Sequence, residues 1–311
     1  MSDQATGFEP APEEENELVS SKLDVVKGYF ARWNSGLRSF ARNRPVSFFW
    51  LVISVLLILM AITAPVIVPH DPNKPDFGHI KEEPSAQAVF GTDNLGRDYL
   101  SRVIYGARVS LFIAAVSVGV GTAIGGAFGI LGGYIGGTFD LITQRFLEIL
   151  ISVPGLLLAI ILVMAIGAGA PAVIIAIAVT RLPTTSRVLR AEVMSVKETQ
   201  YIDSARSIGA SPWRVMFVHV APQTVAPFIV IFTASLGTAI LTEASLGFVG
   251  LGIAPPTATW GGMLGEASYT LIPDWWMVLF PGLFITLAVL AFNLLGDGLR
   301  DVLDPRVRGR L

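Results

Sequence analysis

The chain has 311 residues, of which 52% are hydrophobic and 15% are charged, with no cysteine and a formal net charge of -2. Soluble domains usually carry roughly 25% charged residues, so this composition excludes a soluble enzyme. The lack of cysteine in the sequence excludes thiol catalysis, disulfides and cysteine-ligated zinc. Because 22 Lys and Arg face 24 Asp and Glu, the charge balance indicates no nucleic-acid partner.

Four long runs contain no Asp, Glu, Lys or Arg: residues 45–69, 109–139, 149–180 and 215–242. About 18 to 20 apolar residues suffice to cross a bilayer, so these runs predict membrane-spanning helices. The first run starts too far from the N-terminus for a signal peptide, whose apolar core of roughly 7 to 15 residues lies close to the first residue. We therefore expect this run to be a retained transmembrane helix.

The segment before the first run has two parts. Residues 1–21 are acidic and contain Pro and Ser, which predicts a disordered tail. Residues 22–44 combine six Lys and Arg with apolar side chains at helical spacing, which predicts an amphipathic helix lying at the membrane surface. A helix packed on a soluble domain is the alternative. The apolar side chains are Val26, Phe30, Trp33, Leu37 and Phe40.

The remaining runs predict an all-α integral membrane protein with six spans, near residues 46–69, 108–131, 147–167, 171–190, 224–249 and 276–297. The corresponding division is a first transmembrane helix at 45–70, an extracytoplasmic loop at 71–107, a five-helix core at 108–298 and a tail at 299–311. With the N-terminus inside, the cytoplasmic segments hold 17 Lys and Arg against 5 outside. This bias predicts that both termini are cytoplasmic. The count places residues 181–214, from Arg181 onward, on the cytoplasmic side.

The second span carries glycines at every fourth position, Gly121, Gly125, Gly129, Gly133 and Gly137. Such a stripe lets another helix approach closely where lipid offers no hydrophobic driving force. Two interpretations stay open: packing within one bundle, or a seam that moves or faces a partner subunit.

The longest segment between spans includes residues 191–222, where small and charged residues alternate on a predicted helix and turn. Such a surface suits insertion into a groove of another protein, and a simple connection would usually be shorter. The candidate contact residues are Tyr201, Asp203, Ser204, Ala205, Arg206, Gly209, Ala210, Ser211, His219 and Pro222.

This segment resembles the EAA loop of binding-protein-dependent ABC importer permeases. Asp203, Ser204 and Ala205 stand in the Glu-Ala-Ala positions, Gly209 is at the expected spacing, and His219 with Pro222 closes the motif. Residues 90–98, 243–252 and 296–305 resemble the dipeptide, oligopeptide and nickel permeases of the DppC and OppC type. The resemblance covers residues 40–305 and implies the MetI-like fold of type I importers in a bacterial or archaeal cytoplasmic membrane. Residues 191–222 are called the EAA loop below.

The same resemblance implies the partners of the chain. These are a homologous permease of the DppB or OppB type, two ABC ATPase subunits that dock on the EAA loop, an extracytoplasmic solute-binding protein, and membrane lipid. The solute would be a dipeptide, a longer peptide, a glutathione-like compound or a nickel chelate, and the sequence does not choose among them.

The sequence contains five Lys, none of them within a phosphate-binding Gly-Lys-Ser/Thr loop. We therefore expect no bound cofactor and no enzymatic activity in this chain, with ATP and Mg²⁺ used by the partner ATPases. The alternative is ion-gradient-coupled secondary transport, for which an intramembrane carboxylate such as Glu243 would be the carrier. For Glu243 a structural or gating role, a place along the solute route and proton coupling all remain open.

Other candidate residues are weaker. His70 and His79 lack the close spacing of a zinc-binding helix, so we expect surface histidines outside any pocket and no metal site. Trp260, Trp275 and Trp276 are expected to anchor the chain at the membrane interface, or to contact the binding protein. Arg145 and Glu148 are three residues apart and should form a local ion pair.

Overall fold

The structure is a computed structural model that describes residues 41–42, 44–269 and 274–303. The chain divides into two compact units, residues 1–48 and 49–311. The predicted tail at 1–21 and almost all of the predicted surface helix at 22–44 lie outside the described residues. Within the described ranges the chain is helical, and its extended pairing is limited to an isolated bridge between Thr92 and Asp98.

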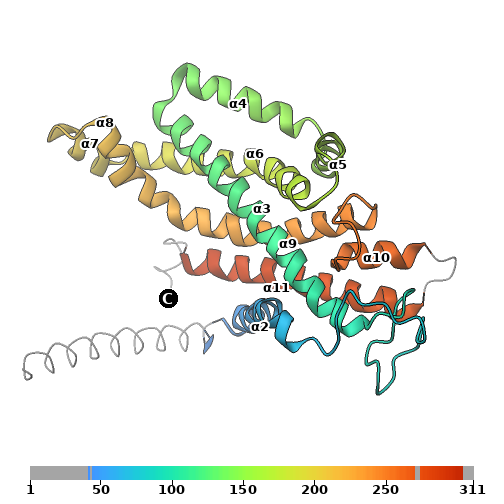
Figure 1. The fold of residues 1–311 in the computed structure, drawn as a ribbon. Coiled ribbons are helices and arrows are strands. Elements are labelled where there is room, and N and C mark those ends of the chain that lie inside the picture. Colours follow the sequence, from blue (N-terminus) through green and yellow to red (C-terminus); the bar gives the residue numbers. More distant parts are fainter. Residues whose placement is uncertain (1–40, 43, 270–273, 304–311) are drawn as a thin grey trace, which may run out of the picture. The chain divides into compact units, whose positions relative to one another are not determined.

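Figure 1 shows the helices in chain order. They are α2 (Pro45–Ile67), α3 (Tyr99–Ile135), α4 (Gly137–Ile151), α5 (Gly155–Ile166), α6 (Ala170–Lys197), α7 (Gln200–Ser207), α8 (Pro212–Arg214), the π-helix η1 (Val215–Val220), the 3-10 helix η2 (Ala221–Thr224), α9 (Val225–Phe248), α10 (Trp260–Ser268) and α11 (Trp275–Leu303).

Five helical segments are long and apolar enough to cross a membrane, those of α2, α3, α6, α9 and α11. The predicted fold class, an all-helical membrane protein, is confirmed. The third predicted span at 147–167 is not one continuous helix, because α4 and α5 meet at an angle of 91°. The break falls at residues 152–154, where Pro154 fixes its own φ and disfavours helical geometry at Val153. The bent pair supplies the sixth span only if both helices are counted together.

The last helix also differs from its expected bounds. α11 continues to Leu303, five residues beyond the predicted end of the core at 298. Asp297 and Arg300 are therefore helical, and the predicted tail begins inside α11.

α3 and α6 cross each other and are in close contact (Figure 1). A Cβ atom added at Gly121, Gly125, Gly129 or Gly133 would lie 2.6, 2.7, 2.5 or 2.9 Å from a carbonyl oxygen of α6. The glycine stripe therefore brings the two backbones together within this chain, as the bundle interpretation expected. Gly137 departs from the stripe, since it starts α4 at a φ of +60° and a Cβ atom added there would meet no described atom within 4 Å.

α4 is attached to α6 by an ion pair. The guanidinium of Arg190 donates to both carboxylate oxygens of Asp140, at 2.6 and 2.5 Å. On the exposed side of α4, Arg145 and Glu148 form the predicted local pair at 2.8 Å. The amphipathic α4 is thus fixed to the core by one face, while α5 presents exposed Leu157, Ile161 and Met164.

The predicted role of the tryptophans at the membrane interface is wrong for two of the three. Trp260 and Trp276 are buried, and their indole N–H groups donate to the carbonyls of Val103 at 3.0 Å and Thr92 at 3.1 Å. They are core residues whose polar edge is satisfied by backbone, which is the usual condition for burying an indole. Trp275 remains 56% exposed.

Candidate functional site

The EAA loop begins as helix, because α6 continues to Lys197 before the chain turns into α7. α7 ends in a Schellman motif, in which the N–H of Gly209 donates to the carbonyl of Arg206 at 3.0 Å and the N–H of Ala210 to that of Ala205 at 3.2 Å. Gly209 has a φ of +83°, which glycine adopts without the steric cost of a Cβ atom. The glycine of the motif therefore ends α7 and turns the chain toward α8.

One face of α7 is buried. Ile202 and Ala205 pack with Val193 of α6 and with Val215 and Val220 of η1. Ala205, one of the candidate contact residues, is only 6% exposed, because its methyl group belongs to this cluster. Small size at this position serves close packing between α7 and its support.

His219, near the end of the motif, contacts the start of α7. The hydroxyl of Tyr201 lies 2.5 Å from Nδ1 of His219, and the two rings meet edge to face. Pro222 follows in η2, where the chain leaves the π-helix η1 and enters α9. Tyr201 and His219, 18 positions apart in sequence, thus join the start of α7 to η1.

The opposite face of α7 and the turn after it are exposed. Asp203 and Arg206 form an ion pair at 3.5 Å, and Ser204 donates to the carbonyl of Gln200. Ile208 is 86% exposed, although it is a large apolar residue. Ser211 caps the short α8 through the N–H of Arg214. The predicted contact residues therefore divide into a buried set that shapes α7 and an exposed set that another protein can reach.

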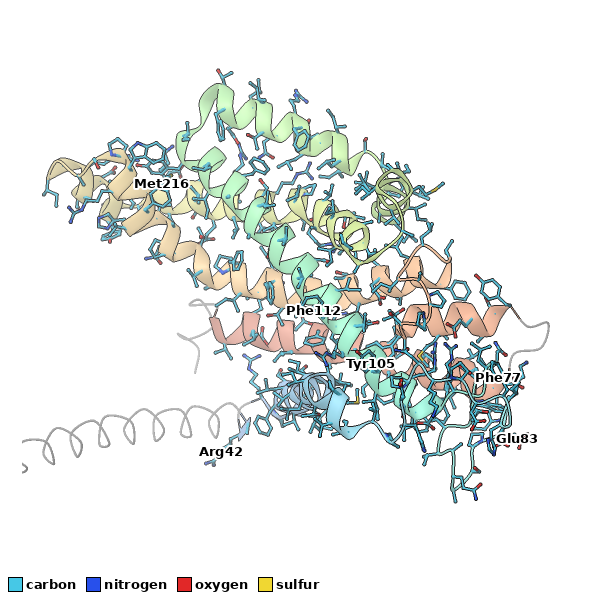
Figure 2. The ribbon with its side chains drawn as sticks, in the orientation of Figure 1. Arg42, Phe77, Glu83, Tyr105, Phe112 and Met216 are labelled. Atoms are coloured by element: carbon cyan, nitrogen blue, oxygen red, sulfur yellow. The ribbon has the colours of Figure 1, made fainter. Side chains whose placement is uncertain are left out.

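An aromatic pair extends this exposed surface. Trp213 and Phe217 are 61% and 60% exposed, and their rings stack at 6.1 Å with an angle of 14°. Neither residue is among the contact residues predicted from the sequence. Their spacing of four residues, which places side chains on one helix face, is the pattern that indicates them. Figure 2 labels Met216, the residue before Phe217, at the end of the molecule that carries α7 and α8.

The EAA loop is also connected to the end of α3. Lys197 donates to the carbonyl of Tyr134 at 2.7 Å, and the Tyr134 hydroxyl donates to the carbonyl of Pro212 at 2.7 Å. A cavity of about 600 Å³ lies there, lined in part by Asp203 and Arg206. The segments on both sides of α7 are therefore connected to the end of α3, one of the two helices joined by the glycine stripe.

Glu243 lies inside the bundle. Its side chain is 1% exposed, on the face of α9 that packs toward α3 and α10, next to Ser110. Neither carboxylate oxygen meets hydrogen-bond geometry with any described residue. Ser110 itself accepts a hydrogen bond from the N–H of Trp260 at 3.2 Å. The carboxyl group is thus enclosed by α3, α9 and α10.

A buried ion network, which was not predicted from the sequence, holds the loop before α3. Arg97 and Arg102 both bind Asp93, at 2.6 and 3.3 Å, and both bind Glu266 of α10, at 2.9 and 3.0 Å. Asp93 and Arg102 are each 0% exposed. The spacing of Asp93 and Arg97 within the 90–98 motif could have indicated part of this network. Glu266 could not have been found, since it is more than 160 residues away in sequence.

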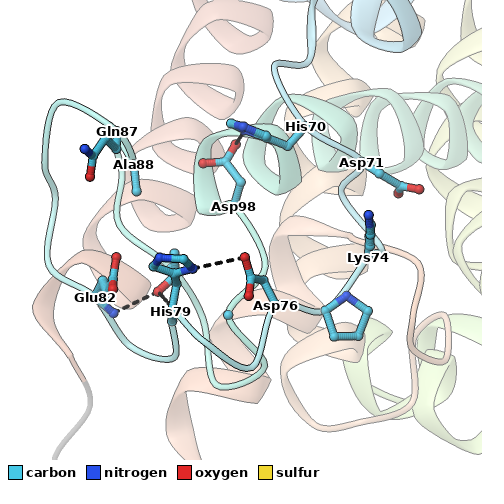
Figure 3. A pocket seen from close by; sticks show the side chains of 12 residues that line it. His70, Asp71, Lys74, Asp76, His79, Glu82, Gln87, Ala88 and Asp98 are labelled. Carbon is cyan, nitrogen blue, oxygen red and sulfur yellow. Dashed lines mark hydrogen bonds and ion pairs between the residues drawn. The ribbon is translucent and has the colours of Figure 1, made fainter.

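The loop also contains a cavity of about 870 Å³, shown in Figure 3. His70 and His79 both line it, contrary to the expectation of surface histidines outside any pocket. Nδ1 of His79 lies 3.0 Å from the Asp76 carboxylate, and that of His70 lies 3.7 Å from Asp98. Across residues 41–42, 44–269 and 274–303, no three His, Asp or Glu side chains are placed to hold a metal ion.

Arg181, which was counted among the cytoplasmic charges, lies within the predicted fourth span at 171–190. It lies in the interior of α6, a helix of 28 residues. A membrane span needs about 18 residues. Any stretch of that length within Ala170–Lys197 includes Arg181, so a span formed by α6 contains this arginine. Without Arg181, the predicted cytoplasmic segments still hold 16 of the 22 Lys and Arg.

Comparison with known proteins agrees with this architecture. Residues 125–309 match the family of the binding-protein-dependent transport system inner membrane component, and residues 32–84 match the N-terminal TM domain of oligopeptide transport permease C. The chain is 44% identical over 296 residues to the glutathione transport system permease protein GsiD of Escherichia coli O1:K1 / APEC, covering 94% of this chain and 97% of that protein. The GsiD protein of Shigella boydii serotype 4 (strain Sb227) has the same identity and coverage.

The fold is also similar to that of a solved transporter. An inward-facing structure of the MetNI methionine ABC transporter gives a TM-score of 0.55 at 19% identity, covering 66% of this chain and 97% of the matched chain. Another crystal form gives a TM-score of 0.53 at 21% identity, covering 65% and 96%. The fold likeness and the sequence matches lead to one conclusion. The chain belongs to the family of binding-protein-dependent transport system inner membrane components, and it is a multi-pass permease subunit of an ABC importer.

Proposed function

We propose that this permease subunit imports peptides or related small solutes, including glutathione-like compounds. Two sequence matches support this solute class: the N-terminal segment matches a domain named for oligopeptide transport, and GsiD is named for glutathione transport. The proposed assembly contains a homologous second permease, two ABC ATPase subunits and an extracytoplasmic solute-binding protein. The binding protein would select the solute before it enters the membrane.

The EAA loop is the proposed docking surface for the ATPase. The observation that carries this assignment is the division of α7 into a buried face with Ile202 and Ala205 and an exposed face with Asp203 and Arg206. The buried face gives the helix a firm base on α6 and η1, so a force applied to the exposed face moves the helices as a unit. Closure of the ATPase would thereby produce a rigid-body change in the membrane helices.

The proposed orientation places both termini and the EAA loop in the cytoplasm. The distribution of Lys and Arg supports it, with 16 on the predicted inner segments once Arg181 is assigned to the interior of α6. The loop before α3 and its cavity would then face the binding protein. We expect ATP and Mg²⁺ to be used by the partner subunits, with no cofactor held by this chain and no enzymatic activity in it.

Two substitutions of Gly209 test the coupling role. Gly209→Val should lower ATP-dependent uptake by at least about tenfold, because a left-handed φ costs a residue with a Cβ roughly 1–2 kcal/mol, and more for a branched one. Gly209→Asn should keep most of the uptake, since Asn tolerates this conformation. No described atom lies within 4 Å of a Cβ built at this position, so the difference reports on the backbone turn.

The measurement is uptake and ATP hydrolysis by the complete importer in liposomes, with membrane insertion checked for each variant. Normal uptake by an inserted Gly209→Val variant would contradict the coupling role. Uptake that continues without the ATPase and stops when the proton gradient is removed would instead favour ion-coupled transport through this chain.

A further inference from the structure

Arg181 is a cation in the middle of a membrane-spanning helix. It lies 11 residues from Ala170, where α6 begins, which is about 16 Å along the helix axis. Its partner Thr238 lies 10 residues from Phe248, where the neighbouring α9 ends. The two helices therefore bring these residues together at about half the depth of a hydrocarbon core roughly 30 Å thick. Charged residues at that depth usually face a water-filled route or a partner.

Two threonine hydroxyls hold the arginine in place. Its Nη1 donates to the Thr238 hydroxyl at 2.9 Å and its Nε to the Thr180 hydroxyl at 3.3 Å. Both hydroxyls donate in turn to carbonyls of their own helices, so their oxygens are oriented toward the guanidinium. Across the described ranges of the chain, no carboxylate lies within ion-pair distance of Arg181, and Nη2 has no hydrogen-bond acceptor.

The base of the side chain is equally fixed. A Cβ atom added at Gly121 of α3 would lie 2.9 Å from Cβ of Arg181, so the start of the side chain packs against the glycine stripe. The guanidinium is consequently directed away from α3 and toward α9. Arginine positioned by packing and two hydrogen bonds loses little freedom when it binds a planar anion.

The surface beside the guanidinium is polar. Thr238, Thr242 and Ser245 follow one face of α9 at helical spacing, and none of the three is buried. Glu243 lies on a different face of α9 and is enclosed by the core. Each of the three hydroxyls donates to a carbonyl of α9 itself, and a row of hydroxyls beside a cation fits an aqueous route.

We propose that Arg181 lines the translocation route and binds a carboxylate group of the solute as it passes. A guanidinium with free donors matches a carboxylate through paired hydrogen bonds, and peptides with a free C-terminus and glutathione both carry that group. This inference rests on the proposed import function. In this proposal Arg181 contacts an anionic group of the solute within the membrane, in addition to the selection made by a binding protein.

Accessibility of position 181 is the first test, and it needs no knowledge of the solute. The sequence contains no cysteine, so Arg181→Cys introduces a single thiol into this chain. In the complete importer, a membrane-impermeant anionic thiol reagent should label that variant at least about tenfold faster than Met164→Cys, whose position is 70% exposed on the apolar α5. Equal labelling rates would overturn the proposal, since Arg181 would then face lipid or be covered by the second permease.

Uptake is the second test, with glutathione and trialanine as probes and the same binding protein throughout. Arg181→Gln should lower the uptake rate of the transported probe about tenfold or more, because it removes a charge-assisted hydrogen bond. Arg181→Lys should keep a larger part of the rate than Arg181→Gln, because it retains the charge but loses the paired hydrogen bonds. Arg145→Gln is the control, since it removes an exposed charge from α4 that pairs locally with Glu148.

The outcomes separate this inference from the proposed function. If the wild-type importer takes up neither probe, the proposed solute class fails, and the labelling test still decides whether Arg181 faces water. If the wild type transports a probe and Arg181→Gln transports it equally well, the carboxylate contact is overturned. Equal loss in the Gln and Lys variants would also overturn it, because the charge would then not be the required property.

Discussion

Two ionisable residues within the helices illustrate how much the environment of a single side chain decides. Glu243 and Arg181 both belong to long apolar helices. Glu243 is buried among α3, α9 and α10, whereas Arg181 is partly buried and donates to the exposed Thr238 hydroxyl. An ionised carboxylate without a cation would cost several kcal/mol in such an enclosure. The two side chains therefore have different surroundings, although a hydropathy profile treats both as charged residues within apolar helices.

In the loop before α3, a histidine and an aspartate provide a test of protonation. The hydrogen bond between His79 and Asp76 raises the pKa of His79 above its ordinary value of 6.5 and lowers the pKa of Asp76 below 3.8. The His79 contribution to stability is complete below pH 6.5 and is lost as the pH rises through its raised pKa. The Asp76 contribution is present above pH 3.8 and is lost as the pH falls through its lowered pKa.

The pair should therefore be most favourable between about pH 4 and 6.5. An NMR titration of the His79 ring in the detergent-solubilised chain measures its apparent pKa, in the wild type and in Asp76→Asn. We expect the apparent pKa of His79 to fall in Asp76→Asn, toward the ordinary value. An unchanged midpoint would show that Asp76 does not interact with the histidine in solution.

At the scale of elements, α3 packs closely on α6, and we expect this packing to transmit a displacement of the EAA loop. α6 carries the loop at one end and Arg181 in its interior, and the glycine stripe fixes its distance from α3. Interfaces packed this tightly move as units, because interiors have little free volume to absorb a displacement. Hydropathy also does not show the 91° break between α4 and α5, because both helices are apolar.

Two glycines of the same helix test the close approach. A Cβ at Gly129 would lie 2.5 Å from the carbonyl oxygen of Ser186, while one at Gly119 would meet no atom within 4 Å. Gly129→Ala should destabilise the chain by about 1–3 kcal/mol through overpacking. Gly119→Ala should be neutral or stabilising by up to about 1 kcal/mol, because Ala favours helix.

Thermal unfolding in detergent measures both variants. The informative quantity is the difference between the two substitutions, because both add the same methyl group to α3. Equal melting temperatures for Gly129→Ala and Gly119→Ala would contradict the tight approach of α3 to α6.

At the scale of the molecule, the ion network joins regions that are distant in sequence. Asp93 and Arg97 lie in the loop, Arg102 lies in the first turn of α3, and Glu266 belongs to α10. Groups buried to this degree need complete pairing, since an unpartnered charge is far more costly than an absent pair. The network therefore fixes the loop and α10 on the start of α3.

Removal of Arg102 tests this arrangement. Arg102→Met leaves Asp93 and Glu266 with Arg97 alone, so we expect a loss of about 3 kcal/mol, the lower end for breaking a buried ion pair. Arg108→Met is the matched control, because Arg108 is exposed on the same helix. Limited proteolysis of the 68–98 loop together with thermal unfolding measures the effect. Similar behaviour of the two variants would show that the network contributes little to stability.

The sequence by itself determined that the protein is a helical membrane protein, where most of its spans lie, and which segment carries the EAA motif. These features depend on local composition and spacing, since a run of apolar residues forms a helix in lipid whatever surrounds it. The Gly209 turn and the Arg145–Glu148 pair belong to the same class, because their partners lie within a few residues.

Only the tertiary structure decided which side chains meet across the helices. The burial of Trp260 and Trp276, the inward face of Ala205 and the pairing of Glu266 with Arg97 and Arg102 depend on contacts between residues far apart in sequence. The same holds for the contact of Arg181 with Thr238, since the two residues are 57 positions apart in sequence. Periodicity gives the face of a helix, but the neighbour that covers that face is set by the packing of the whole chain.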